Sequence, residues 1–208
     1  MNGIRSALVD AVIAALPVAI VFFSGWAYLS SYLGEFGVDA TEVTIPLPTV
    51  LVYAFSPLKS PRVLFFLGIS LAAWLVSEGY GEKTACRNQI TLVTSLVGLV
   101  IFLFVVRDAA QAEARTMAKF VWEGDKALSV PVLVSPHEGE AYAAFEQCRD
   151  RRGLRQILGL PDRMYVFCRD KYYPCQRGRM FVVSTSGSII YSALKFNERE
   201  PGEKECEK

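Results

Sequence analysis

The stretch Ala11–Leu33, AVIAALPVAIVFFSGWAYLSSYL, contains no charged residue over 23 positions. A helix needs about 20 consecutive apolar residues to cross the hydrocarbon core of a bilayer. We therefore predict a membrane-spanning helix here. A cleavable signal peptide is not expected, because the run is too long and the aromatic residues Trp26 and Tyr28 stand where small residues would be needed.

Three further uncharged runs follow, each shorter than the first. They are Val43–Leu58, Val63–Ser77 and Ile90–Val106, with 16, 15 and 17 residues. At about 1.5 Å per residue, a helix over the first of these runs would reach about 24 Å, and the run contains three prolines, Pro46, Pro48 and Pro57. We predict that it either crosses the membrane or forms a re-entrant or interfacial segment. The result is a membrane α-helical bundle with three or four transmembrane helices.

Charged residues are distributed unevenly along the chain of 208 residues. Positions 1–106 hold five of the 22 basic and six of the 21 acidic residues, so about three quarters of the charge lies in the second half. An apolar half followed by a charged half indicates a membrane domain joined to a water-exposed domain. We predict a transmembrane helical domain over 1–107 and a soluble domain over 108–208.

The side on which the soluble domain lies depends on the number of crossings. With four crossings both termini share one side, and the excess of lysine and arginine near the spans places that side in the cytoplasm of a bacterial inner membrane. The basic residues concerned are Arg5, Lys59, Arg62, Arg107 and Arg115. With three crossings the termini lie on opposite sides. The charge distribution favours four crossings and a cytoplasmic soluble domain.

The second half is predicted to be a small mainly-β (α+β) domain. An alanine-rich segment over 108–122 favours a helix that continues the last apolar run as a linking helix. Beyond it, apolar runs separated by turn residues predict an antiparallel sheet of about four to six strands over 130–196. The predicted strands are Val130–Val134, Leu154–Leu158, Met164–Cys168, Arg179–Ser184 and Ser188–Leu194, while Tyr142–Cys148 fits a helix or a strand. Residues 197–208 form a charged tail.

Four of the five cysteines belong to the soluble half; the full set is Cys86, Cys148, Cys168, Cys175 and Cys206. Cys168 and Cys175 flank a loop between two predicted strands. We predict a disulfide between them if the strand ends lie within about 6 Å. Such a bond forms on the oxidising side of a membrane. The cysteines therefore favour a soluble domain outside the cytoplasm, whereas the charge distribution favours a cytoplasmic one. Free cysteines are the alternative interpretation.

A local basic run in the soluble half is a candidate patch for an anionic partner. It comprises Arg149, Arg151, Arg152 and Arg155. Phosphate groups or anionic lipid headgroups would suit it, but Asp150 among the arginines fits an ordinary solvated face better. The whole chain has a net charge of +1, which gives no general attraction to nucleic acid. No nucleic-acid partner is expected.

Small and polar residues in the apolar runs mark candidate helix-packing faces. Small residues four positions apart let helices approach closely in lipid. The pairs are Gly68 with Ala72 and Thr94 with Gly98. Ser24, Tyr28 and Ser31 share one face of the first helix, which would line a polar path in a channel but more often packs against another helix. No charged residue falls within any predicted span, which argues against transport by this chain alone.

The sequence carries no catalytic or cofactor motif. It has no glycine-rich nucleotide-binding loop, no G-x-S-x-G elbow and no H-E-x-x-H zinc motif. The single histidine, His137, and the absence of a C-x-x-C pair leave no close-spaced set of zinc ligands. We expect no cofactor, no metal and no enzymatic activity.

These features favour a non-enzymatic, multi-pass protein of the inner membrane, whose soluble domain binds a protein partner or a second copy of the chain. An accessory subunit, an assembly factor and an immunity protein are all compatible roles. The alternative is an envelope sensor or redox-responsive protein that uses Cys168 and Cys175. A channel or transporter component is a weaker alternative, because it rests on the polar face of the first helix.

Overall fold

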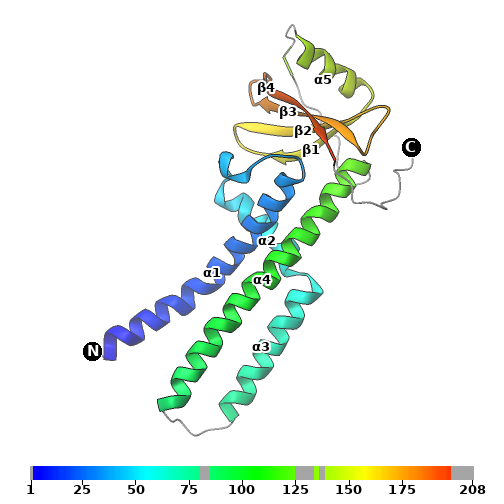
Figure 1. Cartoon of the computed structure of the whole chain (residues 1–208). Coiled ribbons are helices and arrows are strands. Elements are labelled where there is room, and N and C mark those ends of the chain that lie inside the picture. Colours follow the sequence, from blue (N-terminus) through cyan, green and yellow to red (C-terminus); the bar gives the residue numbers. More distant parts are fainter. Residues whose placement is uncertain (1, 80–84, 125–133, 136–138, 198–208) are drawn as a thin grey trace. The chain divides into compact units, whose positions relative to one another are not determined.

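The computed structural model describes residues 2–79, 85–124, 134–135 and 139–197 (Figure 1). The first half contains α1 (Asn2–Gly34), the 3-10 turn η1 (Ala40–Glu42), α2 (Leu47–Leu58), α3 (Pro61–Gly79) and α4 (Ala85–Glu123). The second half contains α5 (Glu140–Asp150), β1 (Leu154–Gly159), β2 (Arg163–Arg169), β3 (Arg177–Ser184) and β4 (Ile189–Phe196). The chain divides into two compact units, the first formed by 1–31 and 46–114 and the second by 32–45 and 115–208.

Some predictions fall outside the described residues. They concern His137, the tail after Asn197 with Cys206, and all of the predicted strand Val130–Val134 except its last residue. A single helix, α4, covers both the last apolar run and the alanine-rich segment over 108–122.

Two helices are long and apolar enough to cross a membrane, over Ala14–Gly34 in α1 and Val93–Glu123 in α4. Leu47–Leu58 and Pro61–Ser70 meet the same requirement only as a pair, and the two are bent by 81°. The described residues therefore allow two crossings, or three if the bent pair counts as one. The chain thus combines membrane-compatible helices with a small β domain, as predicted.

The predicted segment Val43–Leu58 is wrong at its start. The helix α2 begins at Leu47 and has 12 residues, about 18 Å, which is too short to cross a bilayer. Pro46 is extended, with φ −61° and ψ 140°, and caps the helix. Val43 is extended as well, with φ −111° and ψ 121°. The four-crossing arrangement therefore loses its second span.

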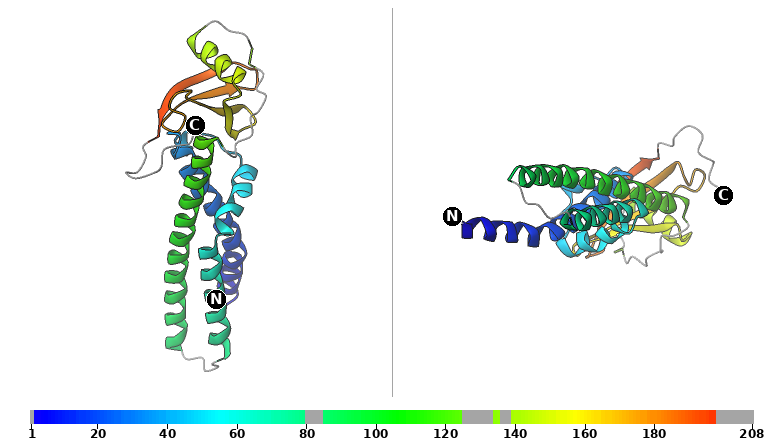
Figure 2. Two further views of the ribbon diagram at one scale, coloured as in Figure 1. Left: turned by 90° about the vertical axis from the view of Figure 1, so that its right-hand side faces the viewer. Right: turned by 90° about the horizontal axis from the view of Figure 1, so that it is seen from below.

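The core of the first unit lies where α3 begins. Val63 of α3 is buried together with Phe102 and Val106 of α4, and Phe23 of α1 and Leu58 of α2 pack against them. Since the first turn of α3 contacts the later part of α4, these two helices run antiparallel, side by side (Figure 2).

α1 and α2 approach each other closely at Gly25, where a Cβ atom would overlap the backbone of α2. The hydroxyl of Ser24, fully buried, donates a hydrogen bond of 3.2 Å to the carbonyl of Ala54. Tyr28 stacks on Tyr53, with ring centroids 5.6 Å apart. The polar face predicted on α1 therefore packs against another helix, and the channel interpretation loses the path on which it rests.

Among the described residues, the predicted small-residue faces do not pack against another helix. A Cβ added at Gly68 or at Gly98 would meet no atom within 4 Å. Ala72 and Thr94 are exposed. The helix-packing glycine of the described bundle is Gly25, because its position faces a neighbouring helix whereas theirs do not.

The second unit contains one antiparallel sheet with strands in the order β1-β2-β3-β4. Cys168 of β2 lies between Leu154 of β1 and Arg179 of β3, and Arg179 pairs in turn with Leu194 of β4. Both predicted hairpins are confirmed, with strand bounds that differ by at most two residues. The β3–β4 turn carries Gly187 at φ 83°, a conformation that glycine adopts at low cost.

α5 covers one face of this sheet (Figure 1). Phe145 of α5 is fully buried in a cluster with Val166, Phe181 and Val183. The ring centroids of Phe145 and Phe181 lie 5.4 Å apart, edge to face. The segment Tyr142–Cys148, which fits a helix or a strand in the sequence, is thus helical, and its buried residues Phe145 and Cys148 pack against one face of the sheet.

The opposite face is covered by residues distant in sequence. The ring centroid of Phe167 lies 4.4 Å from that of Trp122, at the end of α4, and 5.6 Å from that of Phe36, just after α1. Gly178 makes room for this packing, since a Cβ there would overlap the Phe167 ring. Residues 32–45 therefore belong to the second unit, which the predicted boundary between 107 and 108 did not anticipate.

The disulfide of the sheet joins Cys148 to Cys168, with Cα atoms 6.1 Å apart. The predicted bond between Cys168 and Cys175 is therefore wrong. Cys168 points to the face that α5 covers and joins its apolar cluster. The Sγ atom of Cys175 lies 3.7 Å from the carbonyl oxygen of Trp122, which belongs to the cover of the opposite face. Cys175 is itself disulfide-bonded.

Candidate interaction surface

Most exposed large apolar side chains of the second unit lie on β4 or in the turn between β2 and β3. Among its described residues seven are exposed by 39% or more, and six of these belong to β4 or to the turn between β2 and β3. They are Tyr172, Tyr173, Ile190, Tyr191, Leu194 and Phe196. We call these six residues, together with Arg177, the β4 surface. Apolar groups that gather on a water-exposed domain mark interaction sites, whereas single ones do not.

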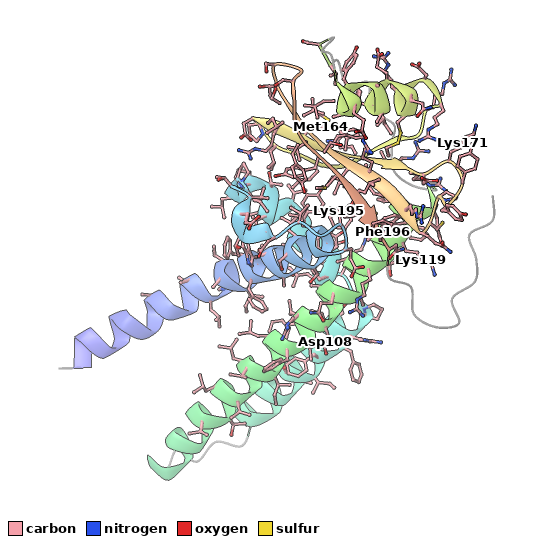
Figure 3. The ribbon with its side chains drawn as sticks, turned by 45° about the horizontal axis from the view of Figure 1, so that its top comes forward. Asp108, Lys119, Met164, Lys171, Lys195 and Phe196 are labelled. Carbon is pink, nitrogen blue, oxygen red and sulfur yellow. A yellow bond between two sulfur atoms is a disulfide. The ribbon has the colours of Figure 1, made fainter. Side chains whose placement is uncertain are left out.

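Arg177 lies against two aromatic rings at one end of the β4 surface. It begins β3, and its partner in the strand register is Phe196. Its guanidinium carbon lies 5.1 Å from the ring centroid of Tyr173 and 5.7 Å from that of Phe196, near the end of β4 labelled in Figure 3. Each cation–π contact of this kind contributes about 0.5–1 kcal/mol at an exposed site. The two rings are held in place although they are 52% and 64% exposed.

β4 is also an edge of the sheet. It pairs with β3 and, within the described part of the chain, with no other strand. The outer side of an edge strand presents a row of N–H and C=O groups to which another strand can add. The one charged residue of β4, Lys195, donates a hydrogen bond of 3.1 Å to the carbonyl of Gly37 on one face of the sheet. Its side chain is thereby engaged within the domain.

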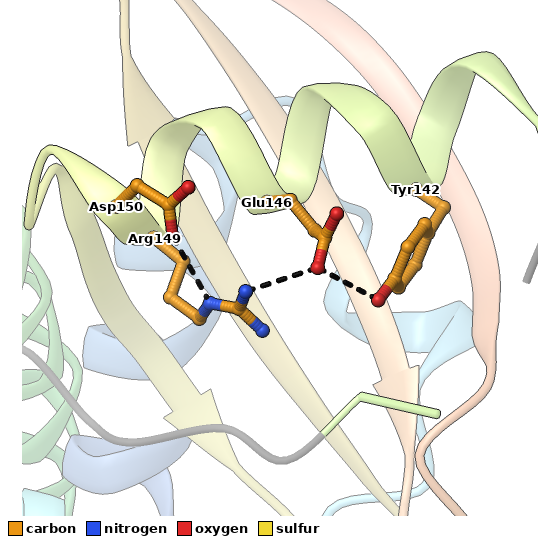
Figure 4. Close-up of polar contacts among 4 residues, drawn as sticks. All are labelled: Tyr142, Glu146, Arg149 and Asp150. Atoms are coloured by element: carbon orange, nitrogen blue, oxygen red, sulfur yellow. Dashed lines mark hydrogen bonds and ion pairs between the residues drawn. The ribbon is translucent and has the colours of Figure 1, made fainter. Parts of the chain in front are cut away.

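The outer side of α5 differs from β4, because its polar groups satisfy one another (Figure 4). The Tyr142 hydroxyl donates to Glu146 at 2.8 Å, and Arg149 donates to the same carboxylate oxygen at 3.0 Å. The Nε atom of Arg149 is 3.5 Å from a carboxylate oxygen of Asp150. The hydrogen bond to Glu146 raises the pKa of the Tyr142 phenol. Pairs at this spacing stabilise a helix by about 0.2–0.5 kcal/mol each, which accounts for the network.

The predicted basic patch does not assemble as four free arginines. Arg149 belongs to the network on α5. Arg151 donates a hydrogen bond of 3.1 Å to the carbonyl of Arg169. Arg155 donates to the carbonyl of Arg152 and to that of the residue before itself, both at 2.9 Å. Three of the four arginines are thus engaged within the domain: Arg149 on α5 itself, and Arg151 and Arg155 at the connection between α5 and the sheet.

The Cys148–Cys168 disulfide lacks the access that a redox site needs. Cys148 is fully buried and Cys168 is 5% exposed. Exchange begins when a thiolate reaches one of the two sulfur atoms, and the apolar cluster under α5 blocks that approach. The redox-responsive interpretation of Cys168 therefore loses support, and the bond acts as a structural brace.

No three His, Cys, Asp or Glu side chains of the described residues are grouped to hold a metal ion. A groove of about 310 Å³ lies between α3 and α4. Its lining consists of Arg62, Phe65, Phe66, Ile69, Val105 and Asp108. Four of these six residues are apolar, and the two charged ones are Arg62 and Asp108.

The β4 surface was not among the predicted sites. The sequence pattern predicts a strand that ends at Leu194, before Phe196, and places Tyr172 and Tyr173 in a loop. One signal was present, since adjacent apolar residues begin β4 (Ile189-Ile190-Tyr191) where a strand with one solvated face would alternate.

Comparisons with protein-family models, with curated protein sequences and with solved structures found no match to this chain.

Proposed function

We propose that this chain is a non-enzymatic, multi-pass membrane protein whose C-terminal domain binds a partner protein through the β4 surface. The observation that carries the proposal is the concentration of six exposed apolar side chains on and beside one edge strand. On the exposed side of α5, by contrast, the polar side chains of Tyr142, Glu146 and Arg149 satisfy one another. The partner that fits is an extended segment that pairs with the backbone of β4 and places apolar side chains against Leu194 and Phe196.

We further propose that α1, α3 and α4 cross the membrane and that α2 does not. The residues that follow α1 and those that end α4 belong to the same unit, where Arg115 lies 3.5 Å from Glu35. α3 runs antiparallel to α4. Three crossings with this alternation place the N-terminal end of α1 on one side of the membrane and the C-terminal domain on the other.

The disulfides favour the oxidising side for the C-terminal domain. The lysines and arginines favour the opposite orientation, because Lys59, Arg62, Arg107 and Arg115 would lie near the membrane on the domain's side. We give the disulfides more weight. A domain as long as this one is translocated largely regardless of its charge, and Arg115 is paired with Glu35. This orientation replaces the cytoplasmic placement predicted from charge.

The sidedness proposal predicts the behaviour of reporter fusions. A reporter enzyme that folds only outside the cytoplasm is fused after Lys208 in one fusion protein and within residues 80–84, between α3 and α4, in another. We expect activity from the first fusion and none from the second, with the reverse for a reporter that fluoresces only in the cytoplasm. Oxidising-side activity from both fusions, or from the inner one alone, would contradict the proposed topology.

The partner proposal predicts position-specific cross-linking in intact membranes. A photoreactive phenylalanine analogue at Ile190 or Leu194, 58% and 57% exposed, should capture a distinct protein on irradiation. The matched control is Asp150, whose side chain is 73% exposed at the end of α5. It should give no such product. Equal products at all three positions would count against the β4 surface.

Charge on the β4 surface should then weaken the interaction. Leu194→Lys places an ammonium at the centre of the proposed contact, and the loss of a central interface residue costs about 2 kcal/mol or more. We expect at least a tenfold lower yield of the cross-link formed at Ile190. Asp150→Lys should leave the yield unchanged. A product whose mass is twice that of the chain would assign the surface to a second copy and overturn the proposal of a different partner.

A further inference from the structure

The groove between α3 and α4 has one helix face as its α3 side. The residues that α3 contributes are Arg62, Phe65, Phe66 and Ile69. Their spacing of i, i+3, i+4 and i+7 places them on the same face of the helix. Phe66 stacks on Phe102 of α4, with ring centroids 5.6 Å apart, whereas Phe65 and Ile69 are 71% and 53% exposed. The groove therefore has one packed aromatic ring and two apolar side chains that are open to the surroundings.

The two charged residues of the groove lie at one of its ends. Arg62 immediately precedes the uncharged run of α3, and Asp108 lies just beyond the uncharged run of α4 that ends at Val106 (Figure 3). Val63 and Val106 belong to one buried cluster, so the two charged residues lie at the same level of the antiparallel pair. The groove is thus charged where the uncharged runs end and apolar where they continue.

Arg62 and Asp108 are both exposed and do not engage each other. Within the described part of the chain, neither side chain forms an ion pair or a hydrogen bond. A guanidinium donates hydrogen bonds to phosphate oxygens, and a carboxylate accepts them from an ammonium group. The end of the groove therefore offers one separate group to each charge of a zwitterionic molecule.

We propose that this groove binds a phospholipid whose headgroup carries both a phosphate and a primary ammonium, as in phosphatidylethanolamine. Arg62 donates to the phosphate, Asp108 accepts from the ammonium, and one acyl chain continues along Phe65 and Ile69. Basic pockets between transmembrane helices bind lipid headgroups, and Asp108 adds the acceptor that a zwitterionic headgroup requires. The volume of about 310 Å³ is near the lower limit for ligand sites, so the remainder of the lipid stays in the bilayer.

This lipid site depends on the proposed crossing of the membrane by α3 and α4, because only then do their uncharged runs lie in hydrocarbon. The charges also predict which lipid is preferred. Phosphatidylglycerol has the phosphate but no ammonium, so the Asp108 carboxylate would lie beside a second negative charge without a donor. Phosphatidylethanolamine is therefore favoured over phosphatidylglycerol.

Native mass spectrometry of the full-length protein in detergent tests the site, with equal amounts of the two lipids added. We expect phosphatidylethanolamine to be bound about tenfold in excess, the effect of one charge-assisted hydrogen bond. Arg62→Gln should lower its occupancy about tenfold, because the phosphate loses its charged donor. Asp108→Asn should keep phosphate binding and abolish the preference. Arg107→Gln is the matched control, since Arg107 is exposed and adjacent to Asp108, and it should bind as the wild type does.

Equal binding of the two lipids by the wild type, or wild-type binding by Arg62→Gln, would overturn the lipid site. A loss in Arg107→Gln as large as that in Arg62→Gln would do the same, because it would reflect surface charge in general. Asp108→Asn is nearly isosteric and tests the site even if Arg62→Gln fails to fold, and a full preference in this variant would overturn the role of Asp108.

The reporter fusions separate this site from the topology on which it depends. Fusions that contradict the crossing by α3 and α4 would overturn the topology and the site with it. Fusions that behave as expected, together with no preference between the two lipids, would overturn the site alone.

Discussion

Replacing both Cys148 and Cys168 by serine will lower the free energy of unfolding of the C-terminal domain by about 3 kcal/mol. The bond closes a loop between residues 20 positions apart, and loops of this length stabilise by about 3 kcal/mol through the entropy removed from the unfolded chain. Both sulfur atoms also lie among apolar side chains. Serine hydroxyls buried there without partners would add a desolvation cost.

Hydrogen exchange of the full-length protein in detergent measures this change. A loss of about 3 kcal/mol corresponds to roughly 100-fold faster exchange in amides that open only by global unfolding of the domain. We expect this acceleration in β2 and β3, and no change in α1 or α4 before Arg115. Cys86→Ser is the control, because that residue lies outside the bond. Wild-type exchange in the double variant would remove the main support for an oxidising-side domain.

The parts of the fold that depend on local sequence pattern could be predicted. The 23 uncharged residues of Ala11–Leu33 predict α1, and the apolar run followed by alanines predicts α4 as one helix. Turn residues around Pro161 and Gly187 predict both hairpins. These features are set by residues within a few positions of one another, so no knowledge of distant contacts is required.

The disulfide pairing could not be predicted in the same way. Cys168 and Cys175 are close in sequence, but they serve different faces of the sheet. Successive residues of a strand alternate between faces, and the choice of face depends on which helix covers it. α5 is ambiguous in the sequence because an 11-residue segment with a few apolar residues fits two periods. The pairing of Cys148 with Cys168 follows only once that segment is helical.

The β4 surface depends on contacts that no local pattern encodes. One face of the sheet is covered by an aromatic cluster whose members are far apart in sequence. They are Phe36, Trp122 and Phe167. Which apolar residues remain exposed is decided by the extent of that cover and of α5. The sequence identifies apolar residues in β4 but cannot say which of them stay uncovered, since burial is a property of the assembled layers.

Truncating Phe167 to alanine will destabilise the C-terminal domain by about 3–5 kcal/mol, the range for removing a buried phenylalanine. Phe167 is fully buried and contacts Trp122 and Phe36, which are 2% and 1% exposed. Its ring fills the space that Gly178 leaves open. The cavity left by the ring cannot close easily, because its neighbours come from three separate segments of the chain.

This variant also tests whether residues 32–45 depend on the sheet. If Phe167 holds Phe36, amide exchange should accelerate in 32–45 as well as in β2 and β3, since one aromatic cluster secures all three. Tyr172→Ala is the matched control. That side chain is 70% exposed, so its removal should change stability by no more than about 0.5 kcal/mol. Acceleration confined to the strands in Phe167→Ala would show that 32–45 is held by other contacts, among them the 3.1 Å hydrogen bond from Lys195 to Gly37.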